Sequence, residues 1–154
     1  MARDIPGYEG KPGHWARRFQ QIAVAVFQSE VEAAGYDLTP VQYAALEAIA
    51  ALPRIDQATL AGQIGFDRAT ITGVIDRLES KELVSRRVSK VDRRARELDV
   101  TAKGAKLLVA VRPHVERAQA IMTRGLTDRE LGELMRLLKK VVEAANDLSR
   151  APKS

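Results

Sequence analysis

The side chains best suited to recognition chemistry in this sequence are arginines and threonines that gather in two short segments. One segment, residues 67–77, carries them on what would be one surface of a helix: Arg68, Thr70, Thr72 and Arg77. The other is the run Asp92-Arg93-Arg94. Arginine can pair with phosphate oxygens or with the edge of guanine, and small hydroxyl residues let a helix approach bases closely. Both segments therefore indicate contacts with a polyanion.

Residues for catalysis or metal binding are scarce. The chain has no cysteine and only two histidines, His14 and His114. This excludes disulfides, thiolate zinc sites and thiol-based redox sensing, and it leaves little material for a transition-metal site. An enzyme would need a nucleophile or a paired acid and base in a pocket, and no glycine-rich phosphate loop is visible. We therefore expect no enzyme activity, no cofactor and no metal.

The excess positive charge is confined to one stretch of the chain. The net charge is +5, and residues 81–106 hold nine Lys or Arg against four acids, whereas the rest of the chain holds sixteen of each sign. Such clustering is typical of a localised footprint on a polyanion, although a solvated basic face is the ordinary alternative. No run approaches the roughly 20 apolar residues that cross a bilayer, and no signal peptide is visible, so we expect a cytoplasmic protein without membrane contact.

Cap residues mark the elements that must position these side chains. Asp56 can cap a short helix over 57–64 that Gly65 ends, and Asp67 can cap a second helix over 68–81. The second helix has one apolar row: Ile71, Val74, Ile75 and Leu78. Because that row faces inward, the arginines and threonines face outward. A short bracing helix, a tight break and a second helix make a helix-turn-helix.

The hydrophobic period changes after the second helix. Leu83 to Val88 read as an extended segment, and Leu98 and Val100 alternate with Glu97 and Asp99 in another. The polar stretch 89–96 between them lacks glycine, which favours a long protruding loop over a tight two-residue turn. We therefore expect a basic β-hairpin, or wing, beside the helix-turn-helix.

Two helices precede this region. Residues 14–34 carry apolar side chains at spacings of three and four, and Gly35 can end that helix. Residues 39–42 form a capping box that starts a helix, which must stop before Pro53. Residues 1–13, with three glycines and two prolines, are expected to form a flexible arm.

Two more helices follow the hairpin. Thr101 can cap the first, and Pro113 inside it predicts a kink. A capping box at 127–130 starts the second, whose apolar residues recur at spacings of three and four: Leu131, Leu134, Leu138, Val141, Ala145 and Leu148. A narrow seam of this kind fits contact with one other helix, either within the chain or from a second copy. Since one recognition helix reads only a few base pairs, we expect a homodimer on a pseudo-palindromic site in double-stranded DNA.

Residues 38–104 resemble the DNA-binding core of the MarR family of regulators. The wing, residues 92–101, fits the family pattern D-x-R-x-x-x-L-x-L-T, with Val100 in place of the second leucine. The other matching stretches share the family's order and spacing: 38–43, 60–61, 67–72, 76–79 and 83–84. The resemblance implies a mainly α fold with a small β-hairpin wing, in which 38–101 form a winged helix-turn-helix and the terminal helices, 14–37 and 102–150, form a dimerisation lobe.

The resemblance also implies roles for the residues in the two segments. Arg94 would enter the minor groove, where a narrow groove concentrates negative potential, and Asp92 would orient it through a charge-assisted hydrogen bond. The DNA-binding set also includes Arg68, Thr70, Thr72, Arg77 and Arg93. The alternative for Asp92 and Arg94 is a surface ion pair of little value, and the alternative for Arg77 is pairing with acids on its own helix.

Members of the MarR family are usually released from DNA by small aromatic acids or related ligands. Residues 36–43 look most like members tied to the breakdown of aromatic compounds, which implies a repressor released by an aromatic acid or its coenzyme A thioester. On the first helix, His14, Trp15 and Arg18 are the candidate effector residues, with arginine for a carboxylate and tryptophan for stacking. Alternatively, Trp15 belongs to the dimer core, His14 is a surface cap and Arg18 is solvated.

Two other binding classes remain for comparison. A protein that binds single strands stacks bases on aromatic side chains, yet no Phe, Tyr or Trp occurs after Phe66. A nonspecific DNA-architectural protein without a small-molecule effector would share the basic wing. Competition with random duplex distinguishes it from a sequence-specific regulator.

Overall fold

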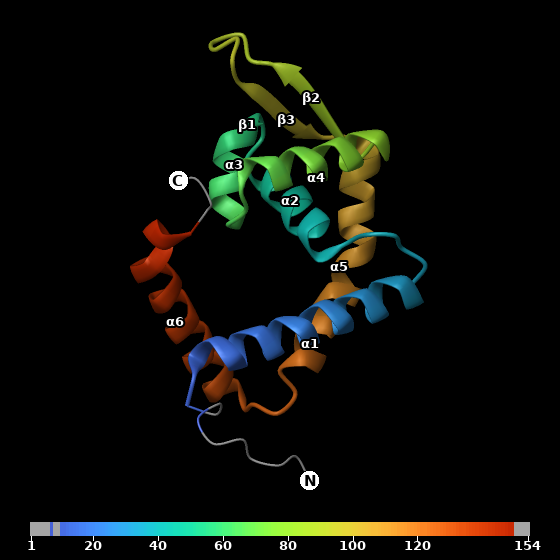
Figure 1. Ribbon diagram of the computed structural model, residues 1–154. Coiled ribbons are helices and arrows are strands. Elements are labelled where there is room, and N and C mark those ends of the chain that lie inside the picture. Colours follow the sequence, from blue (N-terminus) through green and yellow to red (C-terminus); the bar gives the residue numbers. More distant parts are fainter. Residues whose placement is uncertain (1–6, 8–9, 150–154) are drawn as a thin grey trace.

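The computed structural model describes residue 7 and residues 10–149, and within them the chain is mainly helical with a small antiparallel sheet (Figure 1). The elements in chain order are α1 (Pro12–Ala33), α2 (Pro40–Ala51), β1 (Ile55–Asp56), α3 (Gln57–Ile64), α4 (Arg68–Ser80), β2 (Val84–Val88), β3 (Arg96–Val100), α5 (Ala102–Met122), α6 (Asp128–Ala145) and the 3-10 helix η1 (Asn146–Leu148). The predicted fold class, a winged helix-turn-helix with flanking terminal helices, is confirmed.

The helices form a compact lobe and a more open half. Helices α2, α3 and α4 pack together against the sheet, and α5 runs from the sheet to α1, which packs along it (Figure 1). The core joins both halves through large side chains with almost no exposed surface: Val31, Leu46, Ile49, Leu60, Ile71, Ile75, Leu78, Leu98 and Val111. Burying each of them stabilises the fold by about 1.5–3 kcal/mol. The recognition helix α4 is therefore held rigidly by the core.

The predicted starts of α2, α3, α4, α5 and α6 are confirmed by their hydrogen bonds. The carboxylates of Asp56 and Asp67 accept from backbone N–H groups three residues further on, each at 2.9 Å, and Thr101 does the same for α5 at 3.0 Å. Both capping boxes, at 39–42 and 127–130, have their two reciprocal bonds. A cap of this kind contributes about 1 kcal/mol.

The sheet has one strand more than the sequence predicted. Strand β3 lies in the middle of the order β1-β3-β2, so Leu98 is flanked by Ile55 on one side and Arg86 on the other. The hairpin prediction covered β2 and β3 and missed β1. A strand of two residues has no alternation to read, and its pairing with residues some forty positions away is a tertiary contact.

The first turn of α5 packs directly on the base of the wing. A Cβ atom on Gly104 would lie 2.2 Å from the backbone oxygen of Leu83, so no other residue fits there without a shift of the backbone. Thr101 adds two bonds at the same place: its backbone N–H and its hydroxyl donate to the carbonyls of Leu83 and Glu82 at 3.1 and 2.7 Å. The wing is thereby fixed at its base.

The ends of the chain differ from the predicted bounds. Helix α1 begins at Pro12 and not at residue 14, because proline is well suited to the first turn of a helix. Of the predicted arm 1–13, residues 1–6 and 8–9 lie outside the described residues. The last helix ends at Ala145 and a 3-10 turn follows it. Helix α5 includes the exposed Pro113, and the kink remains a prediction.

Candidate nucleic-acid interface

The outer face of α4 is polar and fully accessible. Its inner row is buried as predicted, and seven residues of the opposite side are exposed: Arg68, Ala69, Thr70, Thr72, Gly73, Asp76 and Arg77. The small residues among them leave the backbone open to close approach, since no atom outside the helix lies within 4 Å of a Cβ built on Gly73. This face has the composition that entry into a major groove requires.

Both predicted threonines on this helix already use their hydroxyl protons within the protein. The Thr70 hydroxyl donates to the Asp67 carboxylate at 2.7 Å, and this bond holds the pKa of Asp67 below its ordinary value. The Thr72 hydroxyl donates to the Arg68 carbonyl and accepts from the Gln57 amide, both at 2.9 Å. In this arrangement the threonines can offer a base a lone pair or a methyl group, but no donor.

The acids beside Arg77 pair with a different arginine. Asp76 and Glu79 both accept from the guanidinium of Arg86 on β2, at 2.8 and 3.2 Å. These bonds tie α4 to the wing. Within the described part of the chain Arg77 has no ion pair within 4.0 Å, so its pairing with acids on its own helix, the alternative from the sequence, is not what the structure shows.

The wing tip, residues 89–95, is organised by two polar side chains. The Ser89 hydroxyl oxygen accepts from the backbone N–H groups of Val91 and Asp92 at 3.2 and 3.3 Å. The Asp92 carboxylate accepts from the backbone N–H of Arg94 at 2.9 Å. Asp92 therefore does bond to Arg94, as the resemblance implied, but it fixes the backbone and leaves the guanidinium available. Ser89 itself is 7% exposed, which makes it an internal anchor of an otherwise exposed loop.

Ser89 also links the wing tip to β3. The Ser89 hydroxyl, and after it the Arg87 guanidinium, hold the pKa of the Glu97 carboxyl below its ordinary value. Arg87 also pairs with Glu97 and Asp99, at 3.3 and 3.1 Å. The exposed arginines Arg93 and Arg94 thus stand on a hydrogen-bonded support.

Replacing Ser89 with alanine is expected to loosen the wing tip and leave the fold intact. The variant loses the acceptor of two backbone amides, so we expect affinity for DNA to fall about three- to tenfold. Backbone relaxation measured by NMR should show faster motion at residues 90–95 only. Ser85→Ala, an exposed serine on β2, is the matched control. Unchanged wing dynamics together with unchanged affinity contradicts this role.

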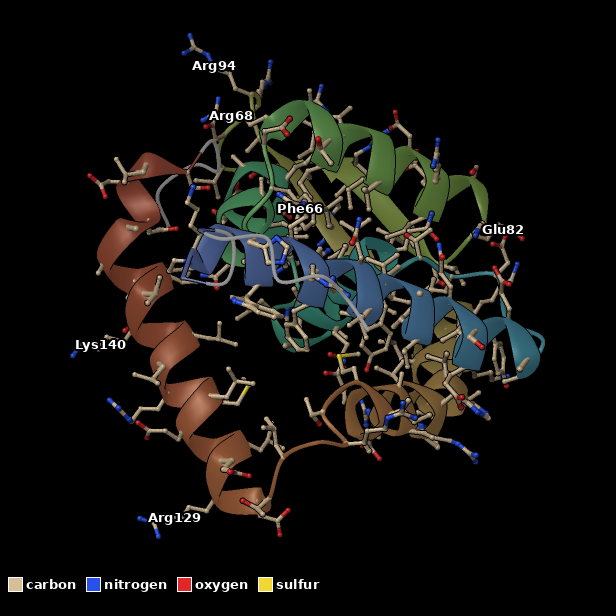
Figure 2. The ribbon with its side chains drawn as sticks, turned by 60° about the horizontal axis from the view of Figure 1, so that its bottom comes forward. Phe66, Arg68, Glu82, Arg94, Arg129 and Lys140 are labelled. Atoms are coloured by element: carbon tan, nitrogen blue, oxygen red, sulfur yellow. The ribbon has the colours of Figure 1, made fainter. Side chains whose placement is uncertain are left out.

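A basic cleft lies between α3, α4 and the wing. Its volume is about 660 Å³, and four arginines line it: Arg54, Arg68, Arg94 and Arg96. Figure 2 shows Arg68 and Arg94 at the same end of α4, on one side of the molecule. The tertiary structure therefore joins the two segments that the sequence singled out into one surface.

The predicted effector residues lie at the start of α1. Trp15 is 52% exposed and lines an apolar groove of about 620 Å³ between α1 and α6. The His14 ring meets the Trp15 ring edge-on, with centroids 5.2 Å apart, and the Arg17 guanidinium lies 3.4 Å from the His14 ring nitrogen. Arg18 is exposed, and neither it nor His14 lines this groove. Only Trp15 of the three lines this groove.

Sequence reasoning missed five residues of the region formed by α4, the basic cleft and the wing: Arg54, Gln57, Arg86, Ser89 and Arg96. Arg86 and Arg96 belong to the basic stretch 81–106, but a count of charges does not distinguish an arginine that bonds to another element from one that only contacts solvent. Ser89 precedes a loop in which its hydroxyl can accept from nearby amides, a local signal that was readable. Gln57 and Arg54 act through partners distant in the sequence.

The described residues contain no cluster of histidine and carboxylate side chains that could hold a metal ion. No helix among residues 10–149 is both long and apolar enough to cross a bilayer.

Known proteins resemble this chain over most of its length. The sequence model described as the MarR family matches residues 38–95. The repressor NicR of Pseudomonas putida is 31% identical over 86% of this chain and 82% of its own. The transcriptional regulator HosA of Escherichia coli is 32% identical over 87% of this chain and 96% of its own.

Solved structures share the whole architecture. The PcaV regulator of Streptomyces coelicolor, in complex with its natural ligand, has a TM-score of 0.84 and 30% identity over 94% of this chain and 99% of its own. BpsR of Bordetella bronchiseptica, whose DNA binding is regulated by 6-hydroxynicotinic acid, has a TM-score of 0.82 and 27% identity over 89% and 96%. The repressor CouR, bound to a 23-mer DNA duplex, has a TM-score of 0.79 and 27% identity over 87% and 94%.

Proposed function

This chain belongs to the MarR family of transcription regulators, and from that premise we propose that it is a homodimeric repressor that binds a pseudo-palindromic operator and is released by a small aromatic acid or its coenzyme A thioester. Residues 38–101 bind the DNA in this proposal, and residues 14–37 and 102–150 form the dimer.

One observation carries the DNA-binding part of the proposal. The polar face of α4 and the Arg94 side chain lie on the same side of the molecule, whereas the opposite row of α4 is buried (Figure 2). A helix and a cationic finger that share one side can engage the major groove and the adjacent minor groove of one duplex. Arg68, Thr70, Thr72 and Arg77 then face bases or phosphates. The wing adds Asp92, Arg93 and Arg94.

The dimer follows from surface that one copy leaves uncovered. Not one residue of α6 is buried, although its apolar residues repeat at helical spacing, and the helix extends from the body as an arm (Figure 1). The large apolar side chains exposed on α1, α6 and the turn before α6 are Trp15, Ile22, Leu126, Met135, Leu137, Leu138, Val141 and Val142. Exposed apolar side chains in this number, gathered on neighbouring elements, indicate an interface.

A second copy of the chain is the occupant that this surface fits. Two apolar grooves, of about 570 and 620 Å³, run between α6 and α1, the first along residues 19–27 of α1 and the second along residues 12–19, and Leu134 and Leu138 line both. In an isologous dimer the α6 ridge of one copy fills the grooves of the other, and the reverse holds by symmetry. To read two half-sites of one duplex, such a dimer must hold its two α4 helices about one turn of DNA apart, roughly 34 Å.

The effector part of the proposal is supported by relatives and by the start of α1. PcaV is known with its natural ligand, and the DNA binding of BpsR responds to an aromatic carboxylic acid. We assign the effector to His14, Trp15 and Arg18, with the indole as a stacking surface and the guanidinium as a carboxylate partner. Because Trp15 lines one of the two proposed dimer grooves, a ligand at this turn of α1 can favour a spacing of the α4 helices that no longer matches the DNA groove.

Selection from a random-sequence duplex library with the purified protein tests the proposal. We expect an enriched pseudo-palindrome that binds on the order of a thousandfold or more tighter than random duplex. Equal affinity for random duplex indicates a nonspecific architectural protein and refutes the regulator. A panel of aromatic acids and their thioesters is then added to the complex. Release by at least one of them is expected, and release that persists in Arg18→Ala shows that the effector binds elsewhere.

A further inference from the structure

Arg54 occupies a backbone position that favours glycine. It lies in the turn between α2 and β1 with a φ of 62°, in the left-handed region. The Ile55 N–H donates to the Leu52 carbonyl at 3.0 Å, so Pro53 and Arg54 are the second and third residues of a four-residue turn. Proline followed by a left-handed residue is the arrangement of a type II turn, whose third position is usually glycine. An arginine here is strained, and the turn itself gives no reason for its side chain.

Arg54 lies at the basic cleft. Arg54 lines the basic cleft together with Arg68, Arg94 and Arg96, and its charge acts electrostatically on Glu97. Its backbone is fixed there as well, because its N–H donates to the Asp99 carboxylate at 3.0 Å. The strained residue is thus held at the wall of a cleft between α4 and the wing.

The cleft contains more guanidinium groups than its own acids neutralise. Of its three carboxylates, Asp56 accepts from the Thr59 amide, Asp92 from the Arg94 amide, and Glu97 pairs with Arg87 outside the cleft lining. Among the residues that the structure describes, none of the four cleft arginines has an ion pair within 4.0 Å. Arg96 uses one guanidinium nitrogen, Nη1, to donate to the carbonyls of Arg93 and Ala95 at 3.2 and 3.4 Å, which holds its side chain at the cleft and leaves its other N–H groups without a partner among the described residues. Arginine side chains without a carboxylate partner in one concave site match the oxygens of a phosphate group.

We propose that Arg54, with Arg96, seats a backbone phosphate of duplex DNA in this cleft, at the point where a strand passes between the major groove read by α4 and the minor groove read by the wing. The inference rests on the proposed function and extends it, because it adds the α2–β1 turn to the elements that contact the DNA. The contact positions the duplex and carries no sequence information.

Arg54→Gly separates binding from folding. Glycine adopts the left-handed conformation without strain, so we expect the melting temperature to stay the same or rise. Affinity for the selected duplex should fall about tenfold, and the slope of log affinity against log salt should fall by about two per dimer, since each copy loses one phosphate contact. The sequence preference should not change.

Glu82→Gly is the matched control. Among the residues that the structure describes, Glu82 is the other non-glycine residue in the left-handed region, with the same φ of 62°, and it lies just after the end of α4, far from Arg94 (Figure 2). Its replacement relieves strain of the same kind, but we expect no loss of DNA affinity. Equal losses in both variants show that the turns and not the guanidinium matter, which overturns the inference.

Neutral methylphosphonate linkages, placed one at a time in the selected duplex, locate the seat. At one linkage in each half-site, the substitution should weaken binding by the wild type and leave binding by Arg54→Gly unchanged. If every methylphosphonate linkage and Arg54→Gly weaken binding additively, or if Arg54→Gly binds with wild-type affinity, the phosphate seat is overturned. The proposed regulator still stands in that case, provided that the wild type prefers the selected duplex and Arg94→Ala weakens binding to it. Binding of inorganic phosphate that depends on Arg54 without such a linkage assigns the cleft to a free anion and also overturns it. If the wild type prefers no duplex, the proposed function fails first.

Discussion

Replacing Arg94 with alanine is expected to weaken binding to the selected operator by about thirtyfold or more, because a dimer loses two groove contacts worth about 1–3 kcal/mol each. The structure explains why the loss should be confined to binding. The Arg94 side chain is exposed, and Asp92 holds the residue through its backbone N–H, a bond that alanine keeps. The wing tip should therefore retain its shape without the guanidinium.

Titrations at two salt concentrations measure this effect. The salt dependence should become shallower, because fewer cations approach the DNA. Arg129→Ala is the matched control: it removes the same charge from an exposed position on α6, far from Arg94 (Figure 2). Affinity that stays at the wild-type value in Arg94→Ala at both salt concentrations removes Arg94 from the groove.

Leu138→Glu is expected to separate the dimer and to abolish operator binding with it. Leu138 is 42% exposed in one copy and lines both grooves between α1 and α6. In an isologous interface the substitution introduces two carboxylates, and each meets an apolar surface without a partner. Since an uncompensated buried charge costs several kcal/mol, the dissociation constant should rise on the order of a thousandfold or more.

Light scattering and sedimentation report the oligomeric state directly. Lys140→Glu makes a larger change of charge two residues further along, at an exposed polar position of α6, and should leave the dimer intact. Circular dichroism should show a folded chain in both variants, because no residue of α6 belongs to the buried core. An intact dimer of Leu138→Glu places the interface elsewhere on the chain.

The two predictions test different links of one argument. Arg94→Ala should leave a dimer that binds DNA weakly, whereas Leu138→Glu should leave single copies that each present one α4 helix. A single α4 reads too few base pairs for tight binding, so the second variant loses binding without any change at the DNA-facing surface. Loss of the dimer with retained operator affinity contradicts the need for two half-sites.

Features that depend on neighbours in the chain were readable from the sequence. The caps at Asp56, Asp67 and Thr101 bond to amides three residues away, and the buried row of α4 follows from helical spacing alone. The same locality explains the fold class, since each helix and the hairpin carry their own signals. The resemblance to the MarR family adds the arrangement of these elements, because its motifs hold their order and spacing along the chain.

Partners across the fold were decided by the tertiary structure alone. Nothing in the sequence says that Asp76 and Glu79 choose Arg86, that the Ser89 hydroxyl acts on Glu97 of β3, or that the turn at Arg54 opens on the basic cleft. A charged side chain can pair with any opposite charge within reach, and reach is set by the packing of elements far apart in sequence. The sequence therefore determined where the helices and the hairpin form and which face of α4 is buried, and the three-dimensional packing added β1 and determined which arginines lack a carboxylate partner and stay available to DNA.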